Sequence, residues 1–270
     1  MTEDAASGRA ARRGRHNDVP PIPPRTPDYG KRAARYDELR PADENWWELF
    51  DVLVREGELR GRRALEIGCG TGRLAAALAE GAVARVWAVD PSPEMLAVAR
   101  ARAPRVAFRE APAERLPFKE AAFDRVVATL VVHVLDRPRA FAEVRRVLRA
   151  DGRLVFATFD PSHMRGFWLN RYFPSMLAAD LERFAPAEAL RRELREAGFV
   201  EVRALRLSQT RTIDRETALE RIRGRHISTF DLLDETEIEA GLKRAVAELP
   251  EEVEYGLEWL VVVASCSSSS

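Results

Sequence analysis

Three glycines at alternate positions, Gly68, Gly70 and Gly72, follow an acidic residue, Glu66, and precede an apolar, alanine-rich run. Glycine has no Cβ atom, so a turn rich in it can adopt positive φ angles and let a ligand lie against the main chain. The dinucleotide fingerprint GxGxxG has its third glycine one position later, where this chain has Arg73. The pattern indicates a nucleotide or nucleoside site, with a purely structural turn as the alternative.

Two carboxylates beside this turn narrow the choice of ligand. Asp90 ends the next predicted strand, 22 positions after Gly68, where a carboxylate can bind both ribose hydroxyls. Its alternative role is to cap the helix that begins near Pro91. Glu66 lies just before the turn, where its charge would repel a pyrophosphate and attract a cation. The two acids therefore favour a nucleoside that carries a positive charge.

Histidines supply the candidates for proton transfer. His133 follows the fourth predicted strand, and an imidazole there could take a proton from a hydroxyl or a phenol. The alternative is a packed histidine in a buried turn. His163 and His226 lie in later segments that could also reach a substrate. Neither the histidines nor the two cysteines, Cys69 and Cys266, have the spacing of metal ligands, so we predict no metal site.

The elements that must position these residues alternate regularly. Seven segments have the pattern of strands, and the first five follow one another closely. They are 62–68, 83–90, 106–111, 123–132, 153–159, 199–210 and 254–266. Helical segments lie between the first and second, the second and third, and the fourth and fifth of them. Such alternation is typical of a parallel sheet that is covered on both faces. We predict an α/β fold, with a doubly wound, Rossmann-like seven-stranded sheet and helical cap insertions.

The sequence divides into a leader, one domain and a tail. Residues 1–28 are rich in Arg, Pro and Gly and lack apolar periodicity, so we expect a disordered leader. Residues 29–266 form the predicted domain, and 267–270 form a disordered tail of serines. Within the domain the alternation breaks at about 161–184 and 211–250. We expect these two insertions to form a cap over the ligand-binding edge of the sheet.

The composition excludes several classes of protein. Lys plus Arg and Asp plus Glu number 43 each, and a chain without net positive charge is a poor candidate for nucleic-acid binding. No apolar run approaches the roughly 20 residues of a membrane span, and the N-terminus lacks the apolar core of a secretory signal. We therefore expect a cytoplasmic protein that binds neither nucleic acid nor membrane. Its oligomeric state is left open.

Several ordered motifs resemble those of class I S-adenosylmethionine-dependent methyltransferases. The segment EIGCGTG at 66–72 resembles their first motif. Later segments resemble the methyltransferase-11 group, which includes ubiquinone- and menaquinone-type enzymes: AVDPSPEMLAVAR at 88–100, AERLPF at 113–118, FDRVVATLVVHVL at 123–135 and EVRRVLRADGRLVF at 143–156. The resemblance covers about 100 residues and fades after Asp160.

The resemblance implies S-adenosylmethionine as the cofactor and adds residues to the site. By motif position, the three glycines would line its methionine part, and Asp90 would hold the ribose. The other implied cofactor-binding residues are Tyr36, Glu66, Met95, Ala113, Glu114 and Leu130. Many relatives have Asp where this chain has Pro112, so Glu114 is the predicted substitute at the adenine.

The predicted function is methyl transfer to a small-molecule acceptor by in-line displacement. Positioning alone can lower such a barrier by roughly 7–11 kcal/mol, so a base such as His133 is not obligatory. Two alternatives are a non-catalytic module that binds S-adenosylmethionine and a NAD-dependent oxidoreductase. Glu66 and the glycine spacing count against the oxidoreductase. The motifs leave the acceptor and its reacting atom open.

Overall fold

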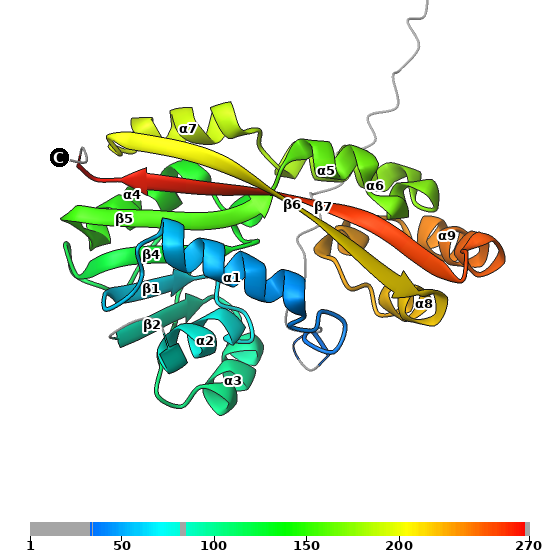
Figure 1. The fold of residues 1–270 in the computed structure, drawn as a ribbon, viewed down its shortest axis with the longest axis horizontal. Coiled ribbons are helices and arrows are strands. Elements are labelled where there is room, and N and C mark those ends of the chain that lie inside the picture. The colour runs from blue at the N-terminus through cyan, green and yellow to red at the C-terminus, as the bar shows by residue number, and fades with distance from the viewer. Residues whose placement is uncertain (1–32, 34, 82–84, 268–270) are drawn as a thin grey trace, which may run out of the picture.

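The structure, a computed structural model, describes residues 33, 35–81 and 85–267 (Figure 1). The predicted leader, 1–28, and residues 268–270 of the predicted tail lie outside the described residues. The core is a seven-stranded sheet with the strand order β3-β2-β1-β4-β5-β7-β6. Helices cover both of its faces. The predicted α/β, Rossmann-like, seven-stranded fold is therefore confirmed.

The first five strands build the parallel part of the sheet. They are β1 (Arg63–Ile67), β2 (Arg85–Asp90), β3 (Ala107–Glu110), β4 (Phe123–Thr129) and β5 (Leu148–Phe159). The pairings among these five strands are all parallel. Val127 of β4 packs into one hydrophobic core and its neighbours Val126 and Ala128 into the other. A strand buried on both faces reads as a continuous apolar run, as this one does.

The helices that cover the sheet are α1 (Glu44–Glu56), α2 (Arg73–Gly81) and α3 (Pro93–Arg102) on one face, and α4 (Arg137–Val147) and α7 (Ala187–Glu196) on the other. Three of them begin after a residue whose side chain caps the first turn. Asp43, Ser92 and Asp136 each accept a hydrogen bond from a backbone N–H of the helix that follows. Such caps satisfy donors that a helix leaves unpaired.

The last two strands differ from the expectation of a parallel sheet. Both β6 (Glu201–Asp214) and β7 (Glu252–Ser265) are antiparallel to their neighbours, and β7 lies between β5 and β6. Residues 259–265 of β7 pair with both neighbours, whereas residues 252–258 pair with β6 alone. Segments 208–214 and 252–258 thus form a two-stranded arm that extends beyond the sheet (Figure 1).

Two insertions form a cap next to the carboxyl ends of the strands. The first contains α5 (Pro161–Gly166), η3 (Trp168–Arg171) and α6 (Pro174–Arg183), and the second contains α8 (Arg215–Arg223), η4 (Ser228–Leu232) and α9 (Glu235–Glu248). The second insertion begins at Arg215 rather than near 211, because β6 continues to pair with β7 through Asp214. Phe173 and Phe230 join the two insertions with ring centroids 5.0 Å apart.

Among the described residues, no helix combines the length and the apolar character that a membrane crossing requires.

Candidate functional site

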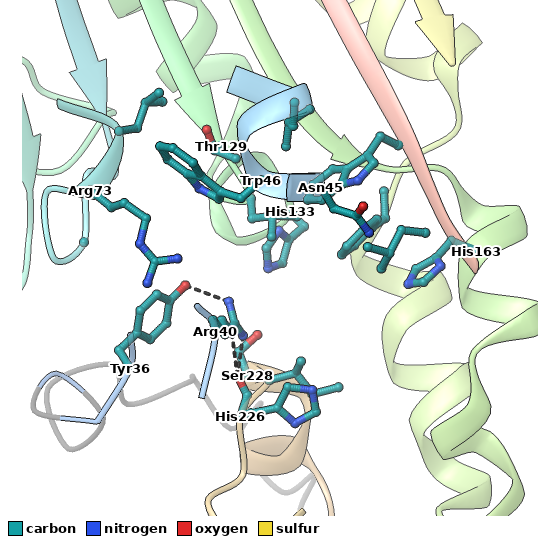
Figure 2. A pocket seen from close by; sticks show the side chains of 18 of the residues that line it. Tyr36, Arg40, Asn45, Trp46, Arg73, Thr129, His133, His163, His226 and Ser228 are labelled. Carbon is teal, nitrogen blue, oxygen red and sulfur yellow. Dashed lines mark hydrogen bonds between the residues drawn. The ribbon is translucent and has the colours of Figure 1, made fainter. Parts of the chain in front are cut away.

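A cavity of about 260 Å³ lies between the glycine turn, α1 and the cap. Figure 2 shows Arg73 on one side of it and His163 on the other, with Thr129 and His133 between them. The predicted site residues that line the cavity are Tyr36, Glu66, Gly68, Gly70, Leu130 and His133. Because both insertions also contribute lining residues, the cavity connects the glycine turn of the sheet to the cap.

The three glycines of the turn differ in what a side chain at each position would contact. All have positive φ angles, between +52° and +74°. A Cβ atom at Gly68 would lie 2.4 Å from Cγ2 of Val131, and one at Gly72 would lie 2.8 Å from Cβ of Ala99. A Cβ at Gly70 would meet nothing within 4 Å. Packing therefore requires the outer two glycines, whereas Gly70 leaves the main chain open to a ligand.

Glu66 places a buried carboxylate beside this turn. Glu66 is only 3% exposed, and its Oε2 atom has no hydrogen-bond partner among the described residues. Burial raises the pKa of Glu66 well above its usual range, the charge of Asp90 raises it further, and a hydrogen bond from the Ala75 backbone partly offsets this. A cationic ligand would stabilise the ionised carboxylate, as expected from the sequence.

Asp90 fixes the shape of the turn. Its Oδ2 accepts a hydrogen bond from the Gly70 N–H at 2.8 Å, and its Oδ1 accepts one from the Ser92 N–H at 2.9 Å. Burial raises the pKa of Asp90, and these two backbone donors lower it. Asp90 is buried and does not line the cavity. Its binding of a ribose stays a prediction.

The residues predicted near the adenine follow β2 and β3. Met95, in the first turn of α3, and Ala113 are buried. Glu114 accepts a hydrogen bond at Oε1 from the Asp136 N–H at 2.9 Å. None of the three lines the cavity, and neither does Gly72. Their contact with a cofactor therefore also stays a prediction.

His133, the predicted base, lies in η2 (Val132–Val134) after β4. Its ring stacks on Phe184 with centroids 4.3 Å apart. Burial, followed by the charges of Arg183 and Arg40, lowers the pKa of His133 well below its usual range. The imidazole is therefore neutral at pH 7, and its protonation next to two arginines is unfavourable. This environment suits a wall of the cavity better than a proton acceptor.

Two further histidines line the same cavity. His163 stacks on Phe159 with centroids 4.2 Å apart, and burial lowers the pKa of His163 to about 4. The Nδ1 atom of His226 lies 3.1 Å from the carbonyl oxygen of Arg221. The structure thus brings together three histidines that are far apart in the sequence. In the part of the chain that it describes, no three His, Cys, Asp or Glu side chains are arranged to hold a metal ion.

A segment before α1, residues 36–40, connects the turn to the cap, and we call it the strap. Asp37 accepts hydrogen bonds from Thr71 Oγ1 at 3.0 Å and from Arg73 at 2.6 Å, and it also pairs with Arg102. Arg40 donates to the carbonyl oxygen of His226 and to the Tyr36 hydroxyl (Figure 2). Sequence reasoning found Tyr36 but missed Asp37 and Arg40, although the charged run YDELR was a usable signal.

Unsatisfied polar atoms are concentrated at this cavity. Within residues 33, 35–81 and 85–267, five buried side-chain atoms have no hydrogen-bond partner. Four of them belong to residues that line the cavity: Glu66 Oε2, Thr129 Oγ1, His133 Nδ1 and Arg211 Nε. Native proteins rarely leave such atoms unpaired. Their clustering indicates that a polar ligand completes this site.

Comparison with known proteins agrees with the fold and the turn. Residues 65–156 match a family model described as a methyltransferase domain. The chain is 36% identical to a demethylmenaquinone methyltransferase of Thermus thermophilus over 202 residues, which cover 63% of this chain and 90% of that protein. It is also 38% identical to an uncharacterized methyltransferase of Mycobacterium tuberculosis over 126 residues, 47% of this chain and 49% of that protein. The match thus spans about half the length of this relative.

A solved structure extends the likeness to the fold of most of the chain. It is a putative methyltransferase from an antibiotic biosynthesis pathway of Anabaena variabilis, with a TM-score of 0.65 and 26% identity. The alignment covers 80% of this chain and 96% of that one. The matched residues 65–156 contain the glycine turn, Glu66 and Asp90. By sequence, by strand order and by the turn beside its cavity, this chain belongs to the family of class I S-adenosylmethionine-dependent methyltransferases.

Proposed function

We propose that this chain transfers a methyl group from S-adenosylmethionine to a small-molecule acceptor by in-line displacement. The observation that carries the proposal is the single cavity that runs from the glycine turn to the cap. At the turn, Glu66 and Gly70 offer a carboxylate and an open main chain. Toward the cap, Phe159 of β5, Trp259 of β7 and Phe184, which follows α6, offer aromatic walls. A donor and an acceptor could therefore meet in one cavity.

The residues at the turn fit the cofactor of the family. The orphaned Oε2 of Glu66 would accept a hydrogen bond from its ammonium group, and Gly70 would let its methionine part lie against the backbone. Tyr36 and Asp37 of the strap would cover it, because both line the cavity. When bound, the cofactor supplies a methyl group on a positively charged sulfur. The strap and the cap would hold the reactants in place and exclude water.

The acceptor end favours a molecule with little charge and an apolar or aromatic body. Three aromatic walls and two imidazoles with lowered pKa values, His133 and His163, surround it. Neutral, stacked rings of this kind bind planar molecules well. The named activity of the Thermus thermophilus relative, on demethylmenaquinone, is consistent with a small-molecule acceptor.

Thermal unfolding with added ligands tests the cofactor. At about 100 times its dissociation constant, a ligand of the folded state adds about 2.7 kcal/mol of stability, which raises Tm by about 5–10 °C for a domain of this size. We expect this shift with S-adenosylmethionine and with S-adenosylhomocysteine. A shift with NAD and none with these two ligands would refute the proposal.

Turnover tests whether the site is catalytic. The purified chain is incubated with S-adenosylmethionine and a library of phenols, amines and thiols, and release of S-adenosylhomocysteine is measured. We expect turnover with one of these classes. Tight cofactor binding without turnover on any member of a broad metabolite library would favour a non-catalytic binding module instead.

A further inference from the structure

Asp180 is a buried acid at the acceptor end of the cavity. It lies in α6, is 3% exposed and lines the cavity with Phe184, one turn further along the helix. Its neighbours on the same face of the helix, Met176 and Phe184, are also buried. An acid in such an apolar row is expensive unless it has a partner or a task.

The hydrogen bonds of Asp180 leave its carboxylate incompletely satisfied. Thr229 of η4 donates from Oγ1 to Oδ1 at 2.6 Å. The nearest charge, Nη1 of Arg183, is 3.7 Å from Oδ1, and this guanidinium donates to Ser228 Oγ at 2.8 Å instead. Among the described residues, no other hydrogen bond reaches the carboxylate, although an ionised carboxylate can accept about four. Asp180 therefore has capacity to accept a proton or a hydrogen bond from a ligand.

The other charged and titratable groups on elements packed against α6 do not satisfy Asp180 either. They are His163 and Arg165 on α5, Arg171 on η3 and Asp231 on η4. Arg165 is exposed, Arg171 pairs with Glu248, and Asp231 acts on Arg225. Burial raises the pKa of Asp180 to about 6, while the Thr229 hydrogen bond and the Arg183 charge lower it. Asp180 is thus mainly ionised at pH 7 and is a stronger base than an ordinary aspartate.

We propose that Asp180, oriented by Thr229, is the catalytic base that takes the proton of a hydroxyl acceptor of the phenol class bound in this cavity. The proposal rests on the proposed function and names its acceptor. At its acceptor end the cavity offers aromatic walls for a ring and the buried carboxylate of Asp180 for its hydroxyl group. His133 is the less suitable base, because its burial and then the charges of Arg183 and Arg40 oppose its protonation.

The proton and the electrons balance in this step. The oxygen lone pair forms the new carbon–oxygen bond as the carbon–sulfur bond of the bound sulfonium breaks, with that electron pair going to sulfur. The hydroxyl proton moves to a carboxylate oxygen of Asp180, which becomes a neutral carboxylic acid. The acid then loses this proton to solvent after the methyl ether leaves. A base with a pKa near 6 suits a phenol, whose pKa is about 10.

The first experiment compares Asp180→Asn with the wild type and with Glu182→Gln, an exposed acid on the same helix. The probes are phenol, catechol and 2-naphthol, with aniline and thiophenol as non-hydroxyl counterparts. We expect turnover on a hydroxyl probe, a loss of roughly 10²–10⁴-fold in kcat for Asp180→Asn, as for removal of a general base, and little change for Glu182→Gln. Calorimetry should show unchanged affinity for S-adenosylhomocysteine in both variants.

The second experiment uses Thr229→Val, which removes the hydrogen-bond donor and keeps the size of the side chain. Without this donor the pKa of Asp180 should rise, so the acid limb of kcat/KM should move upward by roughly one pH unit, the size of one hydrogen bond. Infrared titration without an acceptor should show a carboxylic acid band that titrates near pH 6 in the wild type, moves with Thr229→Val and is absent from Asp180→Asn.

Wild-type kcat in Asp180→Asn, an unmoved acid limb in Thr229→Val, or turnover confined to aniline and thiophenol or absent from all of these probes would each overturn the assignment. A wild-type chain that does not bind S-adenosylmethionine at all would instead refute the proposed function. The calorimetry separates these two failures.

Discussion

At the scale of single residues, the site is defined by polar atoms that the protein itself leaves unpaired. Glu66 Oε2 at the turn and Thr129 Oγ1 at the end of β4 are buried without a partner among the described residues. Each lost hydrogen bond of this kind costs about 1–3 kcal/mol. A protein retains such atoms where a ligand satisfies them, so these residues are the most direct test of the cofactor end.

Glu66→Gln should weaken cofactor binding, because it removes the charge opposite the ammonium group and keeps the shape. A hydrogen bond to a charged group contributes about 1.5–3 kcal/mol, so we expect the Kd of S-adenosylhomocysteine to rise roughly 10- to 150-fold in calorimetry. Glu80→Gln, an exposed acid on α2, is the matched control. Equal affinity in Glu66→Gln and Glu80→Gln would exclude Glu66 from the site.

The same carboxylate should couple binding to proton release. The pKa of Glu66 is raised well above its usual range, and a bound cation favours the ionised form, so binding should release a proton and tighten as the pH rises toward that pKa. Calorimetry in two buffers with different ionisation enthalpies measures this release. Glu66→Gln should abolish its contribution; a wild-type-like buffer dependence in this variant contradicts the coupling.

Sequence reasoning found the cofactor end of the site and missed the acceptor end, for a physical reason. The turn and its acids lie within 25 residues of one another, so their spacing alone predicts a shared site. Asp180 and Thr229 are 49 residues apart and meet only because two insertions pack together. The usable signal was the spacing of Met176, Asp180 and Phe184, four residues apart, which puts an acid in an apolar row of a helix. The sequence also could not show which glycine is open to a ligand, because this depends on the packing of Val131 and Ala99 against the turn.

At the scale of elements, the strap is the least expected part of the site. Asp37 joins it to the turn through Thr71 and Arg73 and to α3 through Arg102, while Arg40 joins it to the cap. The strap therefore spans the two halves of the cavity. If the strap moves away, both halves of the cavity should open.

Asp37→Asn should accelerate the release of cofactor, because it removes two partly buried ion pairs that hold the strap closed. Pairs of this kind contribute up to about 1 kcal/mol each, so we expect the dissociation rate of S-adenosylhomocysteine to rise about 5- to 30-fold. Stopped-flow displacement measures this rate. Glu38→Gln, whose carboxylate pairs with the exposed Arg35, is the control and should leave the rate unchanged. An identical rate in both variants argues against a closing role.

The order of elements was more predictable than their arrangement. Every strand and the breaks in alternation could be located, because periodicity and caps are local properties of the sequence. The insertion of β7 between β5 and β6, and its reversed direction, were not visible. Alternation shows that a strand exists, whereas its neighbours depend on contacts between segments far apart in the chain.

At the scale of the whole molecule, the buried histidines should make stability depend on pH. The pKa of His163 is about 4 in the folded chain and about 6.5 when unfolded. As the pH falls from 6.5 to 4, the unfolded chain binds this proton before the folded chain does, so stability falls by up to about 3 kcal/mol. His133 acts in the same direction. Asp180, whose pKa is raised to about 6, opposes them because its folded form binds a proton in that window, and Glu66 and Asp90, whose pKa values are also raised, act in the same direction as Asp180.

Urea unfolding between pH 4.5 and 7.5 measures this balance. We expect the two histidines to make the free energy of unfolding rise with pH and the acids with raised pKa values to make it fall. His163→Gln should lower the slope of this free energy against pH, because it removes one group that favours the unfolded chain at low pH, and Asp180→Asn should raise it. A slope in His163→Gln that matches the wild type is the contrary result.

The two-stranded arm has a consequence for how such an enzyme can diverge. The family match ends at residue 156, inside β5, and the first cap helix begins at Pro161. The two cap insertions are attached at the ends of β5, β6 and β7. Both can therefore be exchanged without changing the pairing of residues 153–159. They must be exchanged together, since Asp180 and Thr229 belong to different insertions. A chimera that receives both insertions should therefore change its acceptor preference, although Phe159 and Trp259 of the cavity wall stay with β5 and β7.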